Sequence, residues 1–183
     1  KKNEKNIISM LDKIKDRDIE ISFRNKKYFA PKSLSNLKRI LKKNSNSNFL
    51  SGGTDLSLEV TKKRGEIENI ISLNSVKELK FIKKKNRSIE IGSGVSLYEF
   101  QNLIKSYYPD FYDILKRYGS VQIRNVGTLA GNIATASPIG DSLPLLLSLD
   151  SRIKIQTSKS IKIRRLPLAR VVSINSRNEL QFK

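Results

Sequence analysis

The chain has 183 residues, of which 36 are Lys or Arg and 17 are Asp or Glu, so its formal net charge is +19. It contains no Cys and no His. This composition excludes disulfides, iron–sulfur ligation, zinc enzymes, Ser-His-Asp hydrolases and Cys-His proteases built from this chain's own side chains. We therefore expect a cofactor or a partner to carry any covalent or redox chemistry.

The positive charge is spread unevenly along the chain. The net charge is +12 over residues 1–85, −1 over residues 86–150 and +8 over residues 151–183. Aromatic side chains do not alternate with the basic ones, as they would on a surface that stacks nucleic-acid bases. Lys, Asn and Ile are abundant together, which is typical of AT-rich coding. We expect no nucleic-acid partner, and a non-catalytic basic nucleic-acid-binding module stays as an alternative.

The sequence shows no targeting segment. No run of about 18 apolar residues is present, so no membrane-spanning helix is predicted. The charged start, KKNEKNIISMLDKIKD, lacks the apolar stretch and the small-residue cleavage site of a signal peptide. We expect a cytoplasmic protein without a membrane partner.

Residues 1–74 are predicted to form a linker and a first lobe. The N-terminal linker segment covers residues 1–23, where weak apolar spacing is also compatible with a short amphipathic helix. Residues 20–30 alternate like a strand, and Ser33 is a suitable N-cap for the helix that follows Pro31. With short apolar strands near residues 49–50 and 68–73, residues 24–74 predict a β-α-β unit.

Residues 75–183 are predicted to form a second lobe, truncated at its C-terminal end. Residues 79–84 and 88–91 read as paired strands, and Ser96 with Glu99 matches a capping box at the start of a helix. Further helices are expected over residues 110–118 and 142–149, followed by a hairpin of residues 152–156 and 160–164. The fold class is therefore α+β.

The first candidate site is the segment Phe49-Leu50-Ser51-Gly52-Gly53-Thr54-Asp55-Leu56. An apolar strand leads into two glycines, which permit positive φ and leave no Cβ in the way of a ligand. Successive backbone N–H groups in such a turn, together with a following helix N-terminus, would bind a pyrophosphate. The alternative is an ordinary strand-to-helix turn, with Thr54 or Asp55 as the helix cap.

The second candidate site runs from Arg124 to Ser142 and is rich in Gly, Ala, Ser and Thr. Small side chains gain little from burial and suit a backbone that approaches another surface closely. Asn132 offers both a donor and an acceptor, and Asp141 has the chemistry to accept hydrogen bonds from a ribose. The alternative is close helix–strand packing, with Asp141 capping the helix that begins at Ser142.

Tyr118-Gly119 precedes this second loop by a few residues. An aromatic ring at this point could lie beside a planar cofactor, and the alternative is an ordinary packing residue.

Both loops resemble the flavin loops of the molybdenum hydroxylases. The resemblance rests on Ser51–Leu56, on Tyr118–Asn132 and its continuation over Ser137–Pro144, and on the entry segment Tyr28–Leu34. It covers residues 26–168 and is most similar to the FAD-binding domains in small subunits of bacterial xanthine dehydrogenases. The resemblance implies the two-lobed α+β FAD-binding fold of the vanillyl-alcohol oxidase and molybdenum hydroxylase flavoproteins.

The resemblance also implies a set of FAD-binding residues and no catalytic or metal-ligating side chain. From the first loop it implies Phe49, Leu50, Ser51, Gly52, Gly53, Thr54, Asp55 and Leu56, on the pyrophosphate and adenosine side. From the second loop and its surroundings it implies Tyr118 near the flavin, with Thr128, Gly131, Asn132, Thr135 and Asp141.

The family's chemistry implies a place in electron transfer. In such enzymes electrons leave a molybdenum cofactor in another chain or domain, cross 2Fe-2S clusters, reduce FAD and reach NAD. The resemblance therefore implies an oxidoreductase part of xanthine dehydrogenase type, with a molybdenum-cofactor large subunit and a ferredoxin-like 2Fe-2S domain as partners. A flavin subunit of a sister enzyme, acting on carbon monoxide, nicotine or aldehydes, is the alternative within the family.

Overall fold

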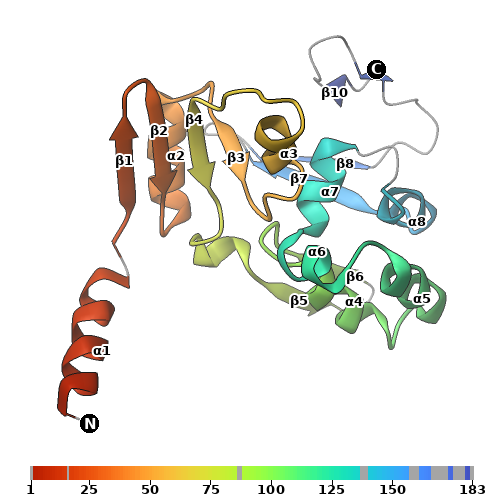
Figure 1. Cartoon of the computed structure of the whole chain (residues 1–183). Helices are drawn as coiled ribbons and strands as arrows, with labels where there is room; N and C mark the ends of the chain where they lie inside the picture. The colour runs from red at the N-terminus through yellow and green to blue at the C-terminus, as the bar shows by residue number, and fades with distance from the viewer. Residues whose placement is uncertain are drawn as a thin grey trace.

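We describe a computed structural model of the chain, covering residues 2–15, 17–85, 88–136, 140–156, 161–165, 173–174 and 180–181. Figure 1 shows helix α1 (Lys2–Lys15) extending away from the rest of the molecule beyond strand β1 (Ile19–Phe23). None of the described helices is long and apolar enough to cross a membrane.

A four-stranded sheet forms the first part of the fold, called here the sheet lobe. Its strand order is β1-β2-β4-β3. The hairpin β1–β2 is antiparallel, whereas β2–β4 and β3–β4 are parallel, as expected for a β-α-β unit. The further elements of this lobe are β2 (Lys26–Ala30), α2 (Leu34–Lys43), β3 (Asn48–Leu50), α3 (Leu56–Thr61) and β4 (Asn69–Ser72).

Helix α2 covers this sheet because its apolar positions recur on one face. The Ser33 hydroxyl accepts a hydrogen bond from the backbone N–H of Asn36, which confirms the predicted N-cap. Leu37 and Ile40 are buried, and they pack with three buried residues of the sheet and the segment after it, Phe29, Ile71 and Val76.

The sequence predicts a linker over residues 1–23, whereas the structure gives this segment a helix and a strand. β1 pairs along its whole length with β2, with Ile19 opposite Ala30 and Phe23 opposite Lys26. All five residues of β1 are exposed. β1 is therefore an edge strand that is held by backbone hydrogen bonds to β2 and has no buried face.

The second part of the fold, called here the helical lobe, holds five α-helices, one short 3-10 helix and two hairpins among the described residues. Its elements are η1 (Lys77–Leu79), β5 (Ile82–Lys85), β6 (Ser88–Ile91), α4 (Leu97–Ile104), α5 (Pro109–Arg117), α6 (Val121–Val126), α7 (Leu129–Thr135), α8 (Ser142–Ser148), β7 (Arg152–Gln156) and β8 (Ile161–Arg165). β9 (Ser173–Ile174) and β10 (Leu180–Gln181) pair beyond them.

A second buried cluster forms the core of the helical lobe. It contains eight buried apolar residues from α4, α5, α7, α8 and the turn before α4, namely Val95, Leu97, Phe100, Ile104, Phe111, Leu115, Leu129 and Leu146. The rings of Phe100 and Phe111 meet edge to face, with centroids 5.4 Å apart. The predicted capping box at α4 and both predicted hairpins are confirmed.

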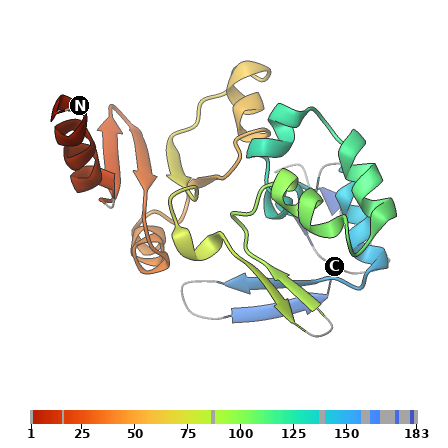
Figure 2. The same cartoon turned by 90° about the horizontal axis from the view of Figure 1, so that it is seen from below.

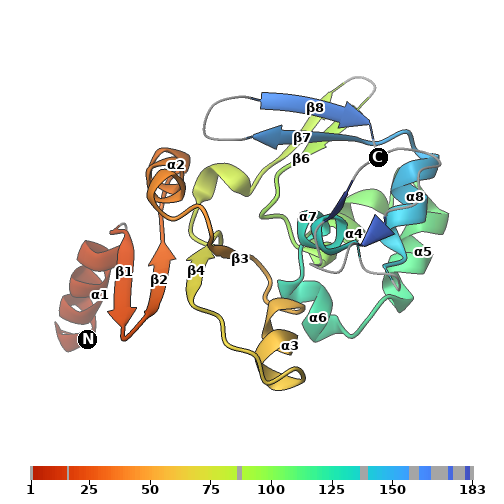
Figure 3. The ribbon, with the colours of Figure 1, turned by 90° about the horizontal axis from the view of Figure 1, so that it is seen from above.

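The two hairpins β5–β6 and β7–β8 lie on one side of the helical lobe, as Figures 2 and 3 show. Lys154 of β7 reaches Glu90 of β6, with its Nζ 4.0 Å from a carboxylate oxygen. The hairpins therefore lie along one side of the helices.

Candidate functional site

The two small-residue loops of the sequence analysis meet in the fold. Loop one (residues 51–55) connects β3 to α3, and loop two (residues 126–128) connects α6 to α7. The hydroxyls of Ser51 and Thr128 lie 3.2 Å apart and share a hydrogen bond. A Cβ on Gly52 would lie 2.2 Å from the carbonyl oxygen of Val126. Segments 77 positions apart in the sequence therefore lie in contact.

Loop one has the backbone geometry of an anion-binding turn. Gly53 has φ +73°, and a Cβ at this position would meet only the side chain of Leu50, at 3.1 Å. Among the described residues, no acceptor lies within hydrogen-bond distance of the backbone N–H groups of Gly53, Thr54 and Asp55. Three successive backbone N–H groups without acceptors, at a glycine with positive φ, suit an anion such as a pyrophosphate.

The helix after loop one is short. α3 has only six residues, Leu56–Thr61, and its N-cap residue Asp55 makes no side-chain capping bond. Loop one is therefore a strand-to-helix turn, as the alternative held, but the side chain of its N-cap residue Asp55 does not cap the helix. The donors of loop one itself, more than a long helix dipole, are what this corner of the molecule offers to a ligand.

Loop two is tied to the start of α4. The carbonyl oxygen of Gly127 accepts a hydrogen bond of 2.8 Å from the backbone N–H of Leu97. Thr128 forms an isolated antiparallel bridge with Ser96 and caps α7 by accepting from the N–H of Gly131 at 3.1 Å. These bonds hold loop two in place from the helical lobe while loop one approaches it from the sheet lobe.

A chain of side-chain hydrogen bonds runs from Tyr118 into the helical lobe. The amide nitrogen of Asn132 donates to the Tyr118 hydroxyl at 2.8 Å, and the amide oxygen of Asn132 accepts from the buried hydroxyl of Ser142. Asn132 is itself buried. Its amide is therefore oriented by protein partners on both ends, and one amide hydrogen is left for a ligand.

The surroundings of Tyr118 change the pKa of its phenol. Burial of the phenol raises the pKa of Tyr118 above its ordinary value, and the nearby carboxylates of Asp55 and Asp141 raise it further against the lowering effect of the Asn132 hydrogen bond. The phenol is therefore neutral at pH 7 and keeps its proton as a hydrogen-bond donor. Asp55 of loop one and Asp141 at the start of α8 thus act on one side chain.

Asp141 does not cap α8 through its side chain. It occupies the N-cap position, but no capping bond from its carboxylate is formed. Its side chain is exposed. The capping alternative is contradicted, and the carboxylate is free to accept a hydrogen bond from a ligand.

Not every residue implied by the resemblance comes to the place where the loops meet. The hydroxyl of Thr135 donates to backbone oxygens of its own helix, those of Gly131 and Asn132. Phe49 is half exposed on β3, and Leu56 begins α3. Residues 137–139, which continue the second motif, lie outside the described residues.

A cavity of about 440 Å³ lies beside the meeting point of the loops. Ser51, Gly52, Asn125 and Thr128 of the two candidate segments line it, together with polar side chains that the sequence analysis did not assign to the site: Asn74, Lys80, Ser96 and Glu99. Lys80 pairs with Glu99 across it, with Nζ and Oε1 3.3 Å apart. Asn74 could have been found from the sequence, because it follows β4 and the carboxyl ends of the parallel strands β3 and β4 share one edge.

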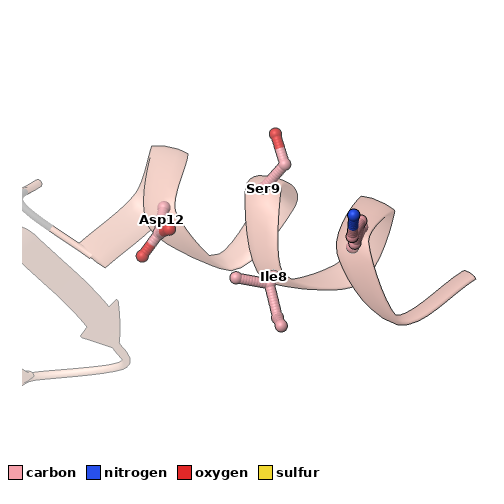
Figure 4. Close-up of a pocket in the computed structure, with 4 residues that line it drawn as sticks. Ile8, Ser9 and Asp12 are labelled. Carbon is pink, nitrogen blue, oxygen red and sulfur yellow. The ribbon is translucent and has the colours of Figure 1, made fainter. Parts of the chain in front are cut away.

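A second hollow lies on α1 and is a poor candidate. It is lined by Lys5, Ile8, Ser9 and Asp12, all from one helix, and Figure 4 shows three of these side chains, Ile8, Ser9 and Asp12, projecting from that helix in different directions. A single exposed helix encloses no ligand, so the meeting point of the loops is the candidate site.

Comparison with known proteins finds relatives along most of this chain. Nicotinate dehydrogenase FAD-subunit of Eubacterium barkeri is 30% identical over 139 residues, which are 74% of this chain and 47% of that protein. Xanthine dehydrogenase 1 of Arabidopsis thaliana is 30% identical over 151 residues, 76% of this chain and 11% of that protein. The chain thus spans about half of the first relative and a small part of the second.

Solved structures share the fold. A carbon monoxide dehydrogenase from Hydrogenophaga pseudoflava superposes with a TM-score of 0.71 at 23% identity, covering 79% of this chain and 51% of that chain. Quinoline 2-oxidoreductase from Pseudomonas putida 86 gives a TM-score of 0.71 at 21% identity, covering 79% of this chain and 52% of that chain. These likenesses confirm the expected α+β fold.

The family itself is given by a sequence model that matches most of the chain. The model describes the FAD-binding domain in molybdopterin dehydrogenases and matches residues 21–181, including both loops and the Tyr118–Asn132 pair. The chain therefore belongs to the family of FAD-binding domains of the molybdenum-dependent hydroxylases.

Proposed function

We propose that this chain holds FAD between loops one and two, with the pyrophosphate on loop one. The observation that carries the proposal is the run of three unpaired N–H groups at Gly53, Thr54 and Asp55, directly beside loop two. Backbone donors suit a doubly charged pyrophosphate because they bind its oxygens without a side chain in between.

The other residues of the site fit the rest of the cofactor. The positive φ of Gly53 suits a turn whose backbone N–H groups face a ligand. Asp141 has a carboxylate without a capping bond to accept hydrogen bonds from hydroxyl groups, and the neutral phenol of Tyr118 presents an aromatic ring and a donor. FAD, when bound, would supply hydride and single-electron chemistry that this chain's side chains lack.

We propose further that the chain serves a xanthine dehydrogenase-type enzyme in which electrons from 2Fe-2S clusters pass through FAD to NAD. The substrate would be hydroxylated at a molybdenum cofactor held by a separate large subunit. Support comes from the relative in Arabidopsis thaliana and from the absence of Cys and His in this sequence, which leaves cluster ligation to a partner.

A nicotinate-oxidising enzyme is the second candidate. The Eubacterium barkeri nicotinate dehydrogenase FAD-subunit matches 74% of this chain, and 47% of its own length is covered, at the same 30% identity as the xanthine dehydrogenase relative. Xanthine and nicotinate are both nitrogen heteroaromatics, so the FAD-binding part alone does not distinguish them.

FAD binding is tested by titrating the 183-residue chain with FAD and following the quenching of flavin fluorescence. We expect Gly53→Val to weaken binding by about tenfold, because a β-branched residue is strained at φ +73° and its side chain crowds the pyrophosphate. Lys84→Ala is the control, since the Lys84 ammonium lies over the Tyr107 ring, away from the loops. Equal affinities for the two variants would contradict the loop-one site.

The enzyme type is tested in the complex with its large subunit. We expect xanthine to reduce the flavin absorbance at 450 nm and NAD to reoxidise it. Reduction by nicotinate but not by xanthine would replace the first candidate with the second. Reoxidation by oxygen alone would contradict NAD as the electron acceptor.

A further inference from the structure

Arg124 is a buried cation beside the candidate site. It lies on α6, and only 7% of its surface is exposed. Its Nη1 donates two hydrogen bonds to backbone oxygens, to Tyr118 at 3.0 Å and to Gly119 at 2.7 Å. Its Nε is buried without a partner, and no carboxylate of the described residues forms an ion pair with it.

Burying an arginine in this way is costly. Guanidinium keeps its charge at any physiological pH, and a buried charge without a counter-charge loses most of its hydration energy. A neutral side chain would pack in the same place at a lower cost. The two hydrogen bonds to consecutive carbonyl oxygens therefore indicate that Arg124 stabilises the conformation of the turn between α5 and α6.

That turn determines where Tyr118 stands. Gly119 has φ +59°, a left-handed conformation that reverses the chain directly after Tyr118. Arg124 binds the carbonyl oxygens of the two consecutive peptide groups that follow Tyr118, those of Tyr118 and Gly119. The Tyr118 hydroxyl in turn accepts from Asn132, whose amide oxygen is bonded to Ser142. A continuous set of bonds thus leads from Arg124 to the side chain beside loop two.

We propose that Arg124 is a positioning residue for the flavin site: by clamping the Tyr118–Gly119 turn it sets the Tyr118 phenol against Asn132 and fixes the direction of the Asn132 amide. This inference rests on the proposed function, since it takes Tyr118 and Asn132 to face FAD. Arg124 itself acts through Tyr118 and need not touch the cofactor.

The first test needs no cofactor. In nitrogen-15 NMR spectra of the 183-residue chain, the Asn132 side-chain amide signals are assigned by their loss in Asn132→Ala. We expect Arg124→Met to shift these signals in the same direction as Tyr118→Phe, which removes the acceptor hydroxyl. Arg117→Met is the matched control, because Arg117 is exposed and its Nε bonds only Asp113 of its own helix. Unmoved Asn132 signals in a folded Arg124→Met chain would overturn the proposal.

The second test is a double-mutant cycle on FAD affinity. We expect Arg124→Met to raise the FAD dissociation constant about tenfold and Tyr118→Phe about fivefold. The double variant should bind no worse than Arg124→Met alone, because both changes break the same set of contacts. Arg124→Lys, with one donor group in place of the fork, should be intermediate. Independent, multiplying effects would overturn action through Tyr118.

The two proposals fail in different ways. A wild-type chain that does not bind FAD contradicts the proposed function, while the NMR test of the clamp still applies. A wild-type chain that binds FAD, with unchanged affinity in a folded Arg124→Met variant, contradicts the clamp alone.

Discussion

At the scale of single residues, the two neighbouring glycines of loop one have different reasons to be glycine. Gly52 has no room for a side chain, because the carbonyl of Val126 and the Cα of Gly127 lie 2.2 Å and 2.6 Å from its Cβ position. Gly53 adopts a positive φ, and a Cβ there would meet only the flexible side chain of Leu50, at 3.1 Å. Gly52 therefore serves the contact between the loops, and Gly53 serves the conformation that turns the backbone donors toward a ligand.

This difference predicts the effect of Gly52→Ala. The added methyl group collides with backbone that cannot rotate away, so we expect the free energy of unfolding to fall by about 2 kcal/mol. Urea denaturation followed by circular dichroism measures it. Ser57→Ala, an exposed change in α3, should stay within about 0.5 kcal/mol of wild type. Equal stability of the two variants would show that loops one and two do not touch in solution.

At the scale of secondary structure, the start of α4 links a local signal to the site. The Ser96 hydroxyl accepts from the Glu99 N–H at 3.1 Å, and the Glu99 carboxylate accepts from the Ser96 N–H at 2.9 Å. Glu99 also pairs with Lys80. The same Ser96 forms the bridge to Thr128, so the cap of one helix also anchors loop two.

The capping box predicts a pH dependence. The hydrogen bond from the Ser96 N–H, aided by the Ser96 hydroxyl and Lys80, lowers the pKa of Glu99 below its ordinary value of 4.5 against the opposing effect of burial. The charged form thus stabilises the fold above pH 4.5, and this contribution is lost as the pH falls through the lowered pKa. We expect the stability gap between wild type and Glu99→Gln, measured by urea denaturation, to shrink from pH 7 to pH 3.

A second variant separates the capping box from net charge. Glu20→Gln removes the same charge from an exposed position on β1. A gap of equal size and pH dependence for Glu20→Gln would mean that overall charge, not the cap, is responsible for the effect.

At the scale of the whole molecule, two separate hydrophobic cores support the two halves of one site. The sheet lobe has five buried core residues and the helical lobe has eight. The loops that meet between them come one from each lobe. A ligand bound at this point touches both lobes and stabilises their arrangement relative to one another.

This arrangement predicts a specific stabilisation by FAD. At a free concentration of 100 times the dissociation constant, FAD should raise the free energy of unfolding by about 2.7 kcal/mol. Thermal denaturation at several FAD concentrations measures it. Riboflavin lacks the pyrophosphate, so at the same concentration it should produce a much smaller shift. An equal shift with riboflavin would place the recognition on the ring and not on loop one.

The fold was predictable where signals are local. Ser33 and Ser96 predict where their helices begin, because a capping hydroxyl bonds a backbone N–H only three residues ahead. The hairpin of β5 and β6 follows from alternation about a short polar turn. β1 is predicted only in part: residues 20–30 alternate like a strand, but residues 1–23 are assigned to a linker, since all side chains of β1 are exposed and its pairing with β2 is not a local signal.

The sequence alone singled out the two segments that we propose to bind FAD, since glycines, small side chains and the position of a carboxylate are properties of residues and their order. Only the tertiary structure decided how they are used: it brought Ser51 to Thr128, buried Arg124 under the Tyr118 turn, and added Asn74 and Lys80 to the cavity. The physical reason is range. Capping and turn preferences act over a few residues, whereas contacts between residues 77 positions apart depend on how both lobes pack.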